Sequence, residues 1–347
     1  MSKKLFIIIS CMMLLMMCSC AGKEKNVSEK QDEPLREFTA LNEVVDGRKD
    51  IYLITKVIDS NYWNVLVEGA RSAGDAFGCN VYFSGTNNEM DWENQLKLLD
   101  QAVSLGADAI ILAPDDSIEL ASKIEEIYSS GIPVILVDTI ANTDSFDICY
   151  MTDNLEAGNK AAKEMIEKLS DMGFSEDEEL TVGILVGSGT SQTINERLAG
   201  FYQYWTDNAP DSWIIIKDIQ NCNGDMELGA DLTASLLKEH KDLHGLFATN
   251  NGPTKVIANT VAEKGCNDVV VVGFDYSDEI SKLISSPDYH ASTILQRQYY
   301  MSYQGVETAL EILDGNQTSI KFEDTGVIVV NHDNLTDPEV QALIEVN

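Results

Sequence analysis

Residues 52–79 read YLITKVIDSNYWNVLVEGARSAGDAFGC. The segment begins as an apolar run, passes through a short polar turn, and resumes with apolar residues at helical spacing. Strand, turn and helix in this order form the unit from which parallel sheets are built, because a crossover must return the chain to the start of the next strand. Tyr62 and Trp63 lie in the predicted turn, where small polar residues are more usual.

Short, nearly all-apolar runs recur along the chain and alternate with amphipathic segments. The runs include NVYFSG, DAIILAP, PVILVD, GLFATNN, DVVVVGFD and HASTILQ, and the segments between them include ENQLKLLDQAVSLG and EAGNKAAKEMIEKLSDMG. Strands that are apolar on both faces indicate parallel sheets covered by helices on both sides. The predicted fold is therefore α/β and doubly wound.

The order of strand, polar turn and helix occurs a second time at residues 180–201, LTVGILVGSGTSQTINERLAGF. Each copy is expected to open a sheet of its own, with the boundary near Thr152 and Asp153. The length of 347 residues also favours two lobes, because it exceeds what one core usually supports.

The amino-terminal residues 1–19, MSKKLFIIISCMMLLMMCS, combine a basic start with a short apolar stretch. This pattern predicts a secretory signal that is too short to span a membrane comfortably. The small residues around Cys20 resemble the lipobox of bacterial lipoproteins, in which a cysteine becomes the lipidated first residue; Cys20 fits better than Cys18, and simple cleavage is the alternative. Residues 20–50 are charged and aperiodic, and are expected to form a flexible tether.

The chain is strongly acidic, with a formal net charge of −33. Such a surface repels phosphate backbones, so nucleic acid is not an expected partner. The cysteines of the predicted globule are Cys79, Cys149, Cys222 and Cys266. They show no metal-ligand spacing, so no metal site is expected; buried free thiols are favoured, with disulfide pairing as the alternative.

Polar and aromatic residues gather just after the predicted strands. Ligands of open parallel sheets bind outside the carboxyl ends of the strands, so these residues are the candidates for a site. They are Lys56, Ser60, Tyr62, Trp63, Asp138, Asn195, Asn250, Asp275 and Gln296. Carboxylates, amides and a flat aromatic wall suit a neutral polyhydroxylated ligand, whose hydroxyls donate and accept hydrogen bonds.

Several segments, taken together in this order and spacing, resemble the type 1 periplasmic-binding-protein family, in particular the ribose-, xylose- and galactose-binding proteins of ABC sugar transporters. Besides the aromatic pair they are GADAIILAPDD, GIPVILVDT, TDNLEAGNKAA, GTSQTINERLAGF, VVVVGFD and HASTILQ. The resemblance covers residues 51–330. It implies two doubly wound lobes joined by a hinge of three chain crossings, an amino-terminal lobe of residues 51–152 and 297–325 and a carboxy-terminal lobe of residues 153–296 and 326–347.

The chain departs from the ribose binders of that family at three places. Thr139 stands where they usually carry arginine, Asn195 stands where they carry another, and Asn223 with Gly224 stand near the place of a second aromatic. These differences disfavour ribose itself as the ligand.

The resemblance implies an extracytoplasmic solute-binding lipoprotein of an ABC importer that closes on a monosaccharide or small polyol. Its expected partner is a membrane permease, and the protein is expected to be a monomer that needs no cofactor and is not an enzyme. Presentation of the ligand to a sensor kinase or chemoreceptor is the alternative function. A glycoside hydrolase, a third and disfavoured function, would need two carboxyl groups across the cleft, a role that Asp138 and Asp275 could fill. Arg197 is expected to be a structural ion-pair partner rather than a ligand contact.

Overall fold

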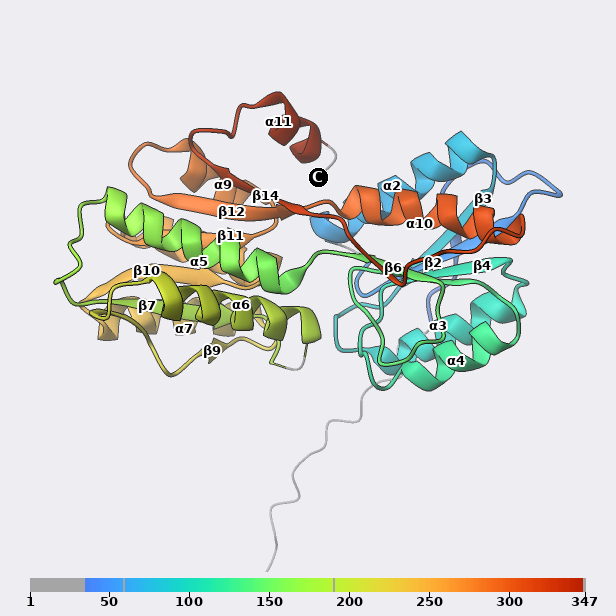
Figure 1. Cartoon of the computed structure of the whole chain (residues 1–347), viewed down its shortest axis with the longest axis horizontal. Helices are drawn as coiled ribbons and strands as arrows, with labels where there is room; N and C mark the ends of the chain where they lie inside the picture. The colour runs from blue at the N-terminus through green and yellow to red at the C-terminus, as the bar shows by residue number, and fades with distance from the viewer. Residues whose placement is uncertain (1–34, 59, 190, 346–347) are drawn as a thin grey trace, which may run out of the picture. The chain divides into compact units, whose positions relative to one another are not determined.

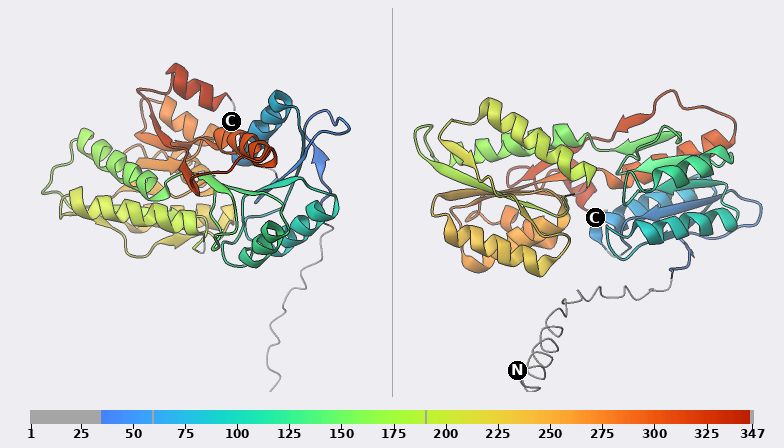
Figure 2. Two further views of the ribbon diagram at one scale, coloured as in Figure 1. Left: turned by 45° about the vertical axis from the view of Figure 1, so that its right-hand side comes forward. Right: turned by 90° about the horizontal axis from the view of Figure 1, so that it is seen from below.

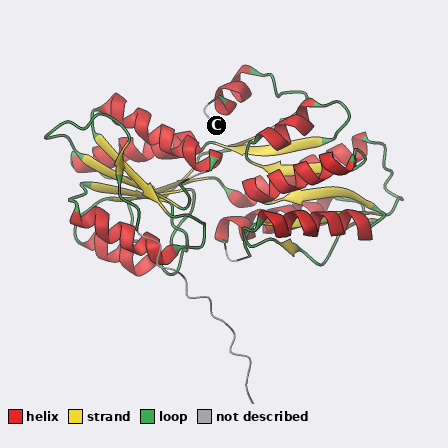
Figure 3. Ribbon diagram, turned by 180° about the vertical axis from the view of Figure 1, so that it is seen from behind, coloured by secondary structure: helices red, strands yellow, loops and turns green. Residues whose placement is uncertain are grey.

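Two sheets, each covered by helices on both faces, organise the part of the chain that this computed structural model describes, residues 35–58, 60–189 and 191–345 (Figures 1 and 3). Both sheets are parallel apart from one antiparallel edge strand each, β1 in the first and β14 in the second. The predicted α/β, doubly wound fold is confirmed. We call the first sheet with its helices the amino-terminal lobe, and the second the carboxy-terminal lobe.

The amino-terminal lobe has the strand order β1-β3-β2-β4-β5-β6-β13. The strands are β1 (Thr39–Ala40), β2 (Asp50–Thr55), β3 (Asn80–Gly85), β4 (Ala109–Leu112), β5 (Val134–Val137), β6 (Ile148–Met151) and β13 (Phe322–Asp324). Its helices are α2 (Asn61–Phe77), α3 (Trp92–Ser104), α4 (Ala121–Ser129) and α10 (Gln298–Leu313). Because side chains alternate along a strand, Ile51 and Leu53 of β2 join the core under α2 and α10, whereas Tyr52 and Ile54 join the core under α3 and α4.

The carboxy-terminal lobe has the strand order β14-β12-β11-β10-β7-β8, with β9 also pairing with β7. The strands are β7 (Leu180–Val186), β8 (Trp213–Ile215), β9 (Gln220–Asn221), β10 (Leu243–Ala248), β11 (Val270–Phe274), β12 (Ala291–Gln296) and β14 (Val327–Asn331). Its helices are α5 (Asn154–Asp171), α6 (Gln192–Asn208), α7 (Met226–Glu239), α8 (Asn251–Lys264), α9 (Asp278–Ser285) and α11 (Pro338–Ile344). Helices α5 and α6 cover one face, and α7, α8, α9 and α11 cover the other.

The strand order of the two lobes is the same in their central parts. The series β3-β2-β4-β5-β6 corresponds to β8-β7-β10-β11-β12, as the internal repeat in the sequence predicts. In both, the chain changes direction across the sheet beside the first core strand, β2 or β7. Such a switch point creates a crevice at the carboxyl ends of the strands, where ligands of these folds bind.

The chain passes between the lobes where β6 is followed by α5, where β12 is followed by α10, and where β13 is followed by β14 (Figures 1 and 2). These crossings are bonded to one another. The Thr152 hydroxyl donates to Gln296 Oε1 at 2.9 Å, and the Thr325 amide donates to the Met151 carbonyl at 3.0 Å. The three crossings therefore form one hydrogen-bonded bundle.

The predicted tether ends earlier than residue 50. Strand β1 pairs with β3, with Thr39 opposite Phe83, and Asn42 bonds to the backbone of Cys79 and Val81. This segment supplies an edge strand and apolar side chains to the lobe, a role that its charged composition conceals. The expected signal, Cys20 and the rest of the tether lie outside the described residues.

The predicted free thiols agree with the described structure, in which Cys79, Cys149 and Cys222 are buried and Cys266 is half-buried, all unpaired. Within the described ranges, no helix is both long enough and apolar enough to cross a membrane.

Candidate ligand-binding site

A cavity of about 530 Å³ lies where the carboxyl ends of both sheets meet, and both lobes line it. We call it the first cavity. It is bordered by eight of the nine residues predicted to contact ligand: Lys56, Ser60, Tyr62, Trp63, Asp138, Asn250, Asp275 and Gln296. Its volume falls within the roughly 300–1,000 Å³ that is usual for small-molecule sites.

Tyr62 and Trp63 lie in the first turn of α2 rather than in the loop before it, because the helix begins at Asn61. The two rings meet edge to face with centroids 4.9 Å apart, and both belong to the core of the amino-terminal lobe. Trp63 is only 2% exposed and Tyr62 6%. Both residues therefore pack in one core and also border the cavity. Ser60, the N-cap residue of α2, makes no capping hydrogen bond with its hydroxyl.

Asp138 is the polar centre of the amino-terminal half. Lys56 Nζ lies 2.9 Å from its Oδ2, the Tyr62 hydroxyl donates to its Oδ1 at 2.5 Å, and the Thr139 hydroxyl donates to Oδ2 at 2.7 Å. Burial acts to raise the pKa of Asp138, but the Lys56 ammonium and these hydrogen bonds outweigh it and hold the pKa below its ordinary value. The carboxylate is therefore charged and compensated.

Arg197 is the cation of the carboxy-terminal half. Its guanidinium donates to Asn154 Oδ1 at 2.8 Å, to the Thr249 carbonyl at 2.9 Å and to Gln296 Oε1 at 2.9 Å, and it lies 4.1 Å from the centroid of the Phe274 ring. In the part of the chain that the structure describes, no carboxylate lies within ion-pair distance of it. The expected structural ion pair is thus wrong: Arg197 is held by uncharged acceptors and borders the cavity.

Asp275 is less well compensated than Asp138. Its Oδ1 accepts from Gln296 Nε2 at 2.8 Å. Burial, together with the charges of Asp138 and Glu89, raises the pKa of Asp275 to about 6, although Arg197 and the Gln296 hydrogen bond act to lower it. A carboxylate in this state gains from any further donor, which a ligand hydroxyl can provide.

The two aspartates occupy equivalent positions at the ends of β5 and β11. Each has a φ of 65°, and each donates its amide to the neighbouring strand, Asp138 to Tyr150 and Asp275 to Ile294. A left-handed conformation is uncommon outside glycine and is concentrated at functional positions. The left-handed residue ends the strand in each lobe. Neither aspartate caps the helix that follows; α9, for example, is capped by Ser277.

The Asn250 side chain packs directly against the backbone of Gly187 at the edge of the cavity. Asn250 is the N-cap residue of α8 but makes no capping bond with its side chain. A Cβ at Gly187 would lie 2.4 Å from Asn250 Oδ1, so the close approach requires glycine there.

Asn195 is the one predicted contact that does not border the first cavity. It borders a neighbouring cavity instead, and Arg197, two positions along α6, takes the place expected for it. Sequence reasoning also passed over residues 87–90, which follow β3 and border the first cavity. The rule that collected the other candidates, position just after a strand, would have identified them.

Among the described residues, no three histidine, cysteine or acidic side chains lie close enough together to hold a metal ion. The geometry therefore suits ligand binding rather than a metal centre.

The profile of the periplasmic binding protein domain family matches residues 51–317. The chain belongs to this family. The relatives described next are binding proteins, which agrees with the expectation that the chain is not an enzyme.

Relatives of this periplasmic binding protein include the D-ribose/D-allose-binding protein of Pseudomonas aeruginosa, 26% identical over 84% of this chain and 90% of the relative. The ribose import binding protein RbsB of Escherichia coli is 25% identical over 80% of this chain and 88% of the relative.

Solved structures agree with this assignment. A carbohydrate transporter solute-binding protein from Agrobacterium radiobacter, in complex with D-arabinose, has a TM-score of 0.81 and 28% identity over 86% of this chain and all of the other. An ABC transporter solute-binding protein from Agrobacterium vitis with bound D-fucose has a TM-score of 0.76 and 26% identity over 84% of this chain and 98% of the other.

Proposed function

We propose that this protein is the extracytoplasmic solute-binding lipoprotein of an ABC importer, and that it binds a monosaccharide or related small polyol between its two lobes. The observation that carries the proposal is the composition of the first cavity, in which two aspartates, amide side chains and an aromatic pair converge from separate sheets. The sugar-binding relatives support it.

The charges around the cavity favour a neutral ligand. Lys56 is matched by Asp138 at 2.9 Å, and Arg197 lies close enough to Asp275 to lower its pKa. An anionic ligand would need a cation whose donors are free. The ammonium of Lys56 and the guanidinium of Arg197 are already bonded, and the third cation of the lining, Lys255, is matched in number by a third carboxylate, Glu89. Neutral hydroxyls can instead donate to the carboxylates and accept from the amides without disturbing either cation.

The proposed mechanism is closure of two lobes, residues 35–152 with 297–325 and residues 153–296 with 326–345. Ligand contacts from both lobes stabilise the closed form relative to the open one, so binding shifts the population toward closure. The closed form is then recognised by a membrane permease. Cys20 is the proposed site of the lipid anchor, and mass spectrometry of the mature amino terminus, with Cys20→Ser as control, tests it.

The ligand class is tested by thermal-shift screening of the purified protein against pentoses, hexoses, polyols and small acids, followed by calorimetric titration. A rise in melting temperature with sugars or polyols is expected. A rise with acids alone would overturn the proposal.

A further inference from the structure

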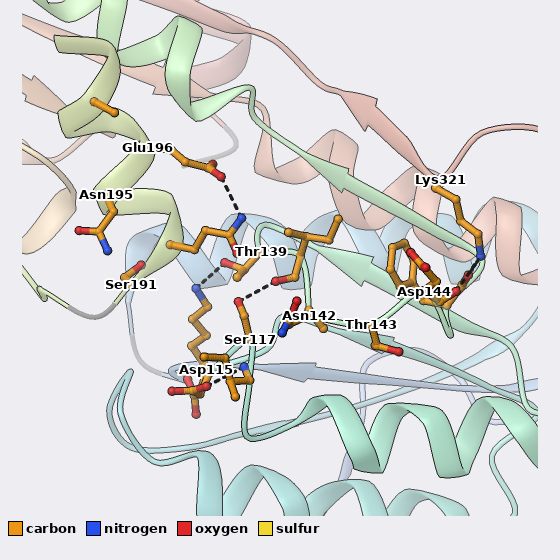
Figure 4. A pocket seen from close by; sticks show the side chains of 18 residues that line it. Asp115, Ser117, Thr139, Asn142, Thr143, Asp144, Ser191, Asn195, Glu196 and Lys321 are labelled. Atoms are coloured by element: carbon orange, nitrogen blue, oxygen red, sulfur yellow. Dashed lines mark hydrogen bonds between the residues drawn. The ribbon is translucent and has the colours of Figure 1, made fainter. Parts of the chain in front are cut away.

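A second cavity of about 1140 Å³ adjoins the first, and Lys56 and Ser191 border both. Both lobes contribute to it. Figure 4 shows Asn195 of α6 and Ser191, the N-cap residue of that helix, on one side of it, and Asp115 and Ser117 from the loop after β4 on the other. The first cavity already has the volume of a small-molecule site, so the second is additional space that a single sugar ring does not need.

The side chains of the second cavity resemble those of the first in chemistry. Hydroxyls, amides and carboxylates border it, including Ser117, Asn142, Thr143 and Gln192. Its two cations have their ammonium groups engaged: Lys56 bonds to Asp138 and Thr139, and Lys321 donates to the carbonyls of Asp144 and Phe146. The lining therefore suits a neutral polar group rather than an anion.

Two side chains in this lining have hydrogen-bonding capacity that the described residues leave unused, although Thr86 donates to Asp115 Oδ2 at 3.4 Å. The Oδ1 atom of Asp115 is buried without a hydrogen bond, and the Asn142 side chain is exposed at the cavity (Figure 4). Burial raises the pKa of Asp115 to about 8, so near neutral pH its carboxyl group also carries a proton to donate. Ile118, which is 70% exposed, adds an apolar side chain to the same lining.

Short neutral residues border the second cavity at two positions where a longer charged side chain was expected. Thr139 and Asn195 are the places where the resemblance to ribose binders leads one to expect arginine, and both border the second cavity. The Lys56 ammonium donates to the Thr139 hydroxyl at 2.6 Å, and that hydroxyl in turn donates to Asp138. Both differences leave room between the lobes beside the first cavity.

We propose that the cleft accepts a neutral glycoside of two or more sugar units, with the terminal unit in the first cavity and the next unit in the second. This inference rests on the proposed function, since it assigns the first cavity to a sugar. It extends the ligand from the single sugar unit of the proposed function to an oligosaccharide or a glycoside with a polar substituent.

Calorimetric titration with matched sugars tests the inference. The probes are D-xylose with xylobiose, D-glucose with maltose and cellobiose, and D-galactose with lactose. At least one disaccharide is expected to bind about tenfold or more tightly than its own monosaccharide, because about 1.4 kcal/mol from a few further contacts is enough. Monosaccharides that bind as tightly as every disaccharide would overturn the inference and leave the proposed function intact, whereas no binding by any sugar would contradict both.

Variants in the second cavity locate the effect. Asn195→Arg places a long side chain in the second cavity and is expected to remove most of the disaccharide advantage while monosaccharide affinity changes by less than about twofold. Gln203→Arg, at an exposed position on the same helix, is the matched control and should change neither. Asn142→Ala, from the other lobe, should lower only disaccharide affinity by a few-fold, as loss of about one hydrogen bond does. Equal losses for both sugar classes in these variants would refute the placement.

Discussion

Asp275→Asn should make the empty protein more stable at neutral pH while weakening ligand binding. Asp275 is 3% exposed, and burial raises its pKa from 3.8 to about 6. Its side chain receives one hydrogen bond, from Gln296. Asparagine has nearly the same shape, tolerates the left-handed backbone at this position, and has no charge to desolvate.

The magnitude follows from the difference in pKa between the folded and unfolded chain. A group whose pKa is raised on folding binds its proton more tightly in the folded state, so the free energy of unfolding falls as pH rises from about 4 to about 6 and stays lower above that range. A difference of about two pKa units corresponds to on the order of 3 kcal/mol. Asp275→Asn should recover this amount at pH 7 and almost nothing at pH 4.

Melting temperature measured from pH 4 to pH 8 is the assay. In domains of 150–250 residues, about 1 kcal/mol moves the melting temperature by roughly 2–4 °C, so a gain of several degrees at pH 7 is expected. Asp138→Asn is the matched control. Its pKa is lowered in the fold, so its carboxylate contributes stability that is present above pH 4 and lost as pH falls through the folded pKa, and its replacement should destabilise the protein at pH 7.

The reasoning is refuted if Asp275→Asn is less stable than the parent at pH 7, or if it keeps the parent's pH profile. A gain in stability without loss of sugar affinity would instead show that Asp275 does not contact the ligand. The expected combination, higher stability with weaker binding, is the usual relation between a strained functional group and the fold that holds it.

Three further substitutions test single contacts. Trp63→Ala should weaken sugar binding at least tenfold and also lower the melting temperature, because a buried tryptophan typically costs about 3–5 kcal/mol when truncated; an unchanged melting temperature would show that Trp63 is not a core residue. Tyr62→Phe removes a donor from Asp138 and should weaken binding several-fold by calorimetry, with a control titration showing unchanged stoichiometry. Gly187→Ala places a Cβ against Asn250 and should weaken binding by displacing that amide, whereas Gly189→Ala, whose Cβ would be 3.0 Å from an Asn221 side-chain nitrogen, should have a smaller effect.

The strand-end rule predicted most of the candidate site because the carboxyl ends of parallel strands meet along one edge of a sheet. It works without knowledge of packing: Asp138 and Asp275 follow apolar runs, and their position in the chain alone places them at that edge. The fold was predictable for the same reason, since apolar runs alternating with helical segments leave few other arrangements.

The choice between Asn195 and Arg197 depends on helix phase, which position after a strand does not determine. Successive residues of a helix are about 100° apart, so these two side chains point in nearly opposite directions. The signal was present in the periodicity of α6, where Ile194, Arg197 and Phe201 lie on one buried face. The extent of the tether was missed because pairing of β1 with β3 depends on an edge hydrogen-bond pattern that a charged sequence does not display.

The two equivalent aspartates differ because their cations are used differently. The Lys56 ammonium lies 2.9 Å from Asp138 and compensates its charge directly. The Arg197 guanidinium is instead occupied by an amide oxygen and a backbone carbonyl as well as by Gln296, so it lowers the pKa of Asp275 only in part. The same backbone position therefore yields one carboxylate whose hydrogen bonds come from the protein and one that still lacks donors. A ligand hydroxyl that donates to Asp275 supplies what the carboxy-terminal lobe does not, and this gives binding a larger gain at Asp275 than at Asp138.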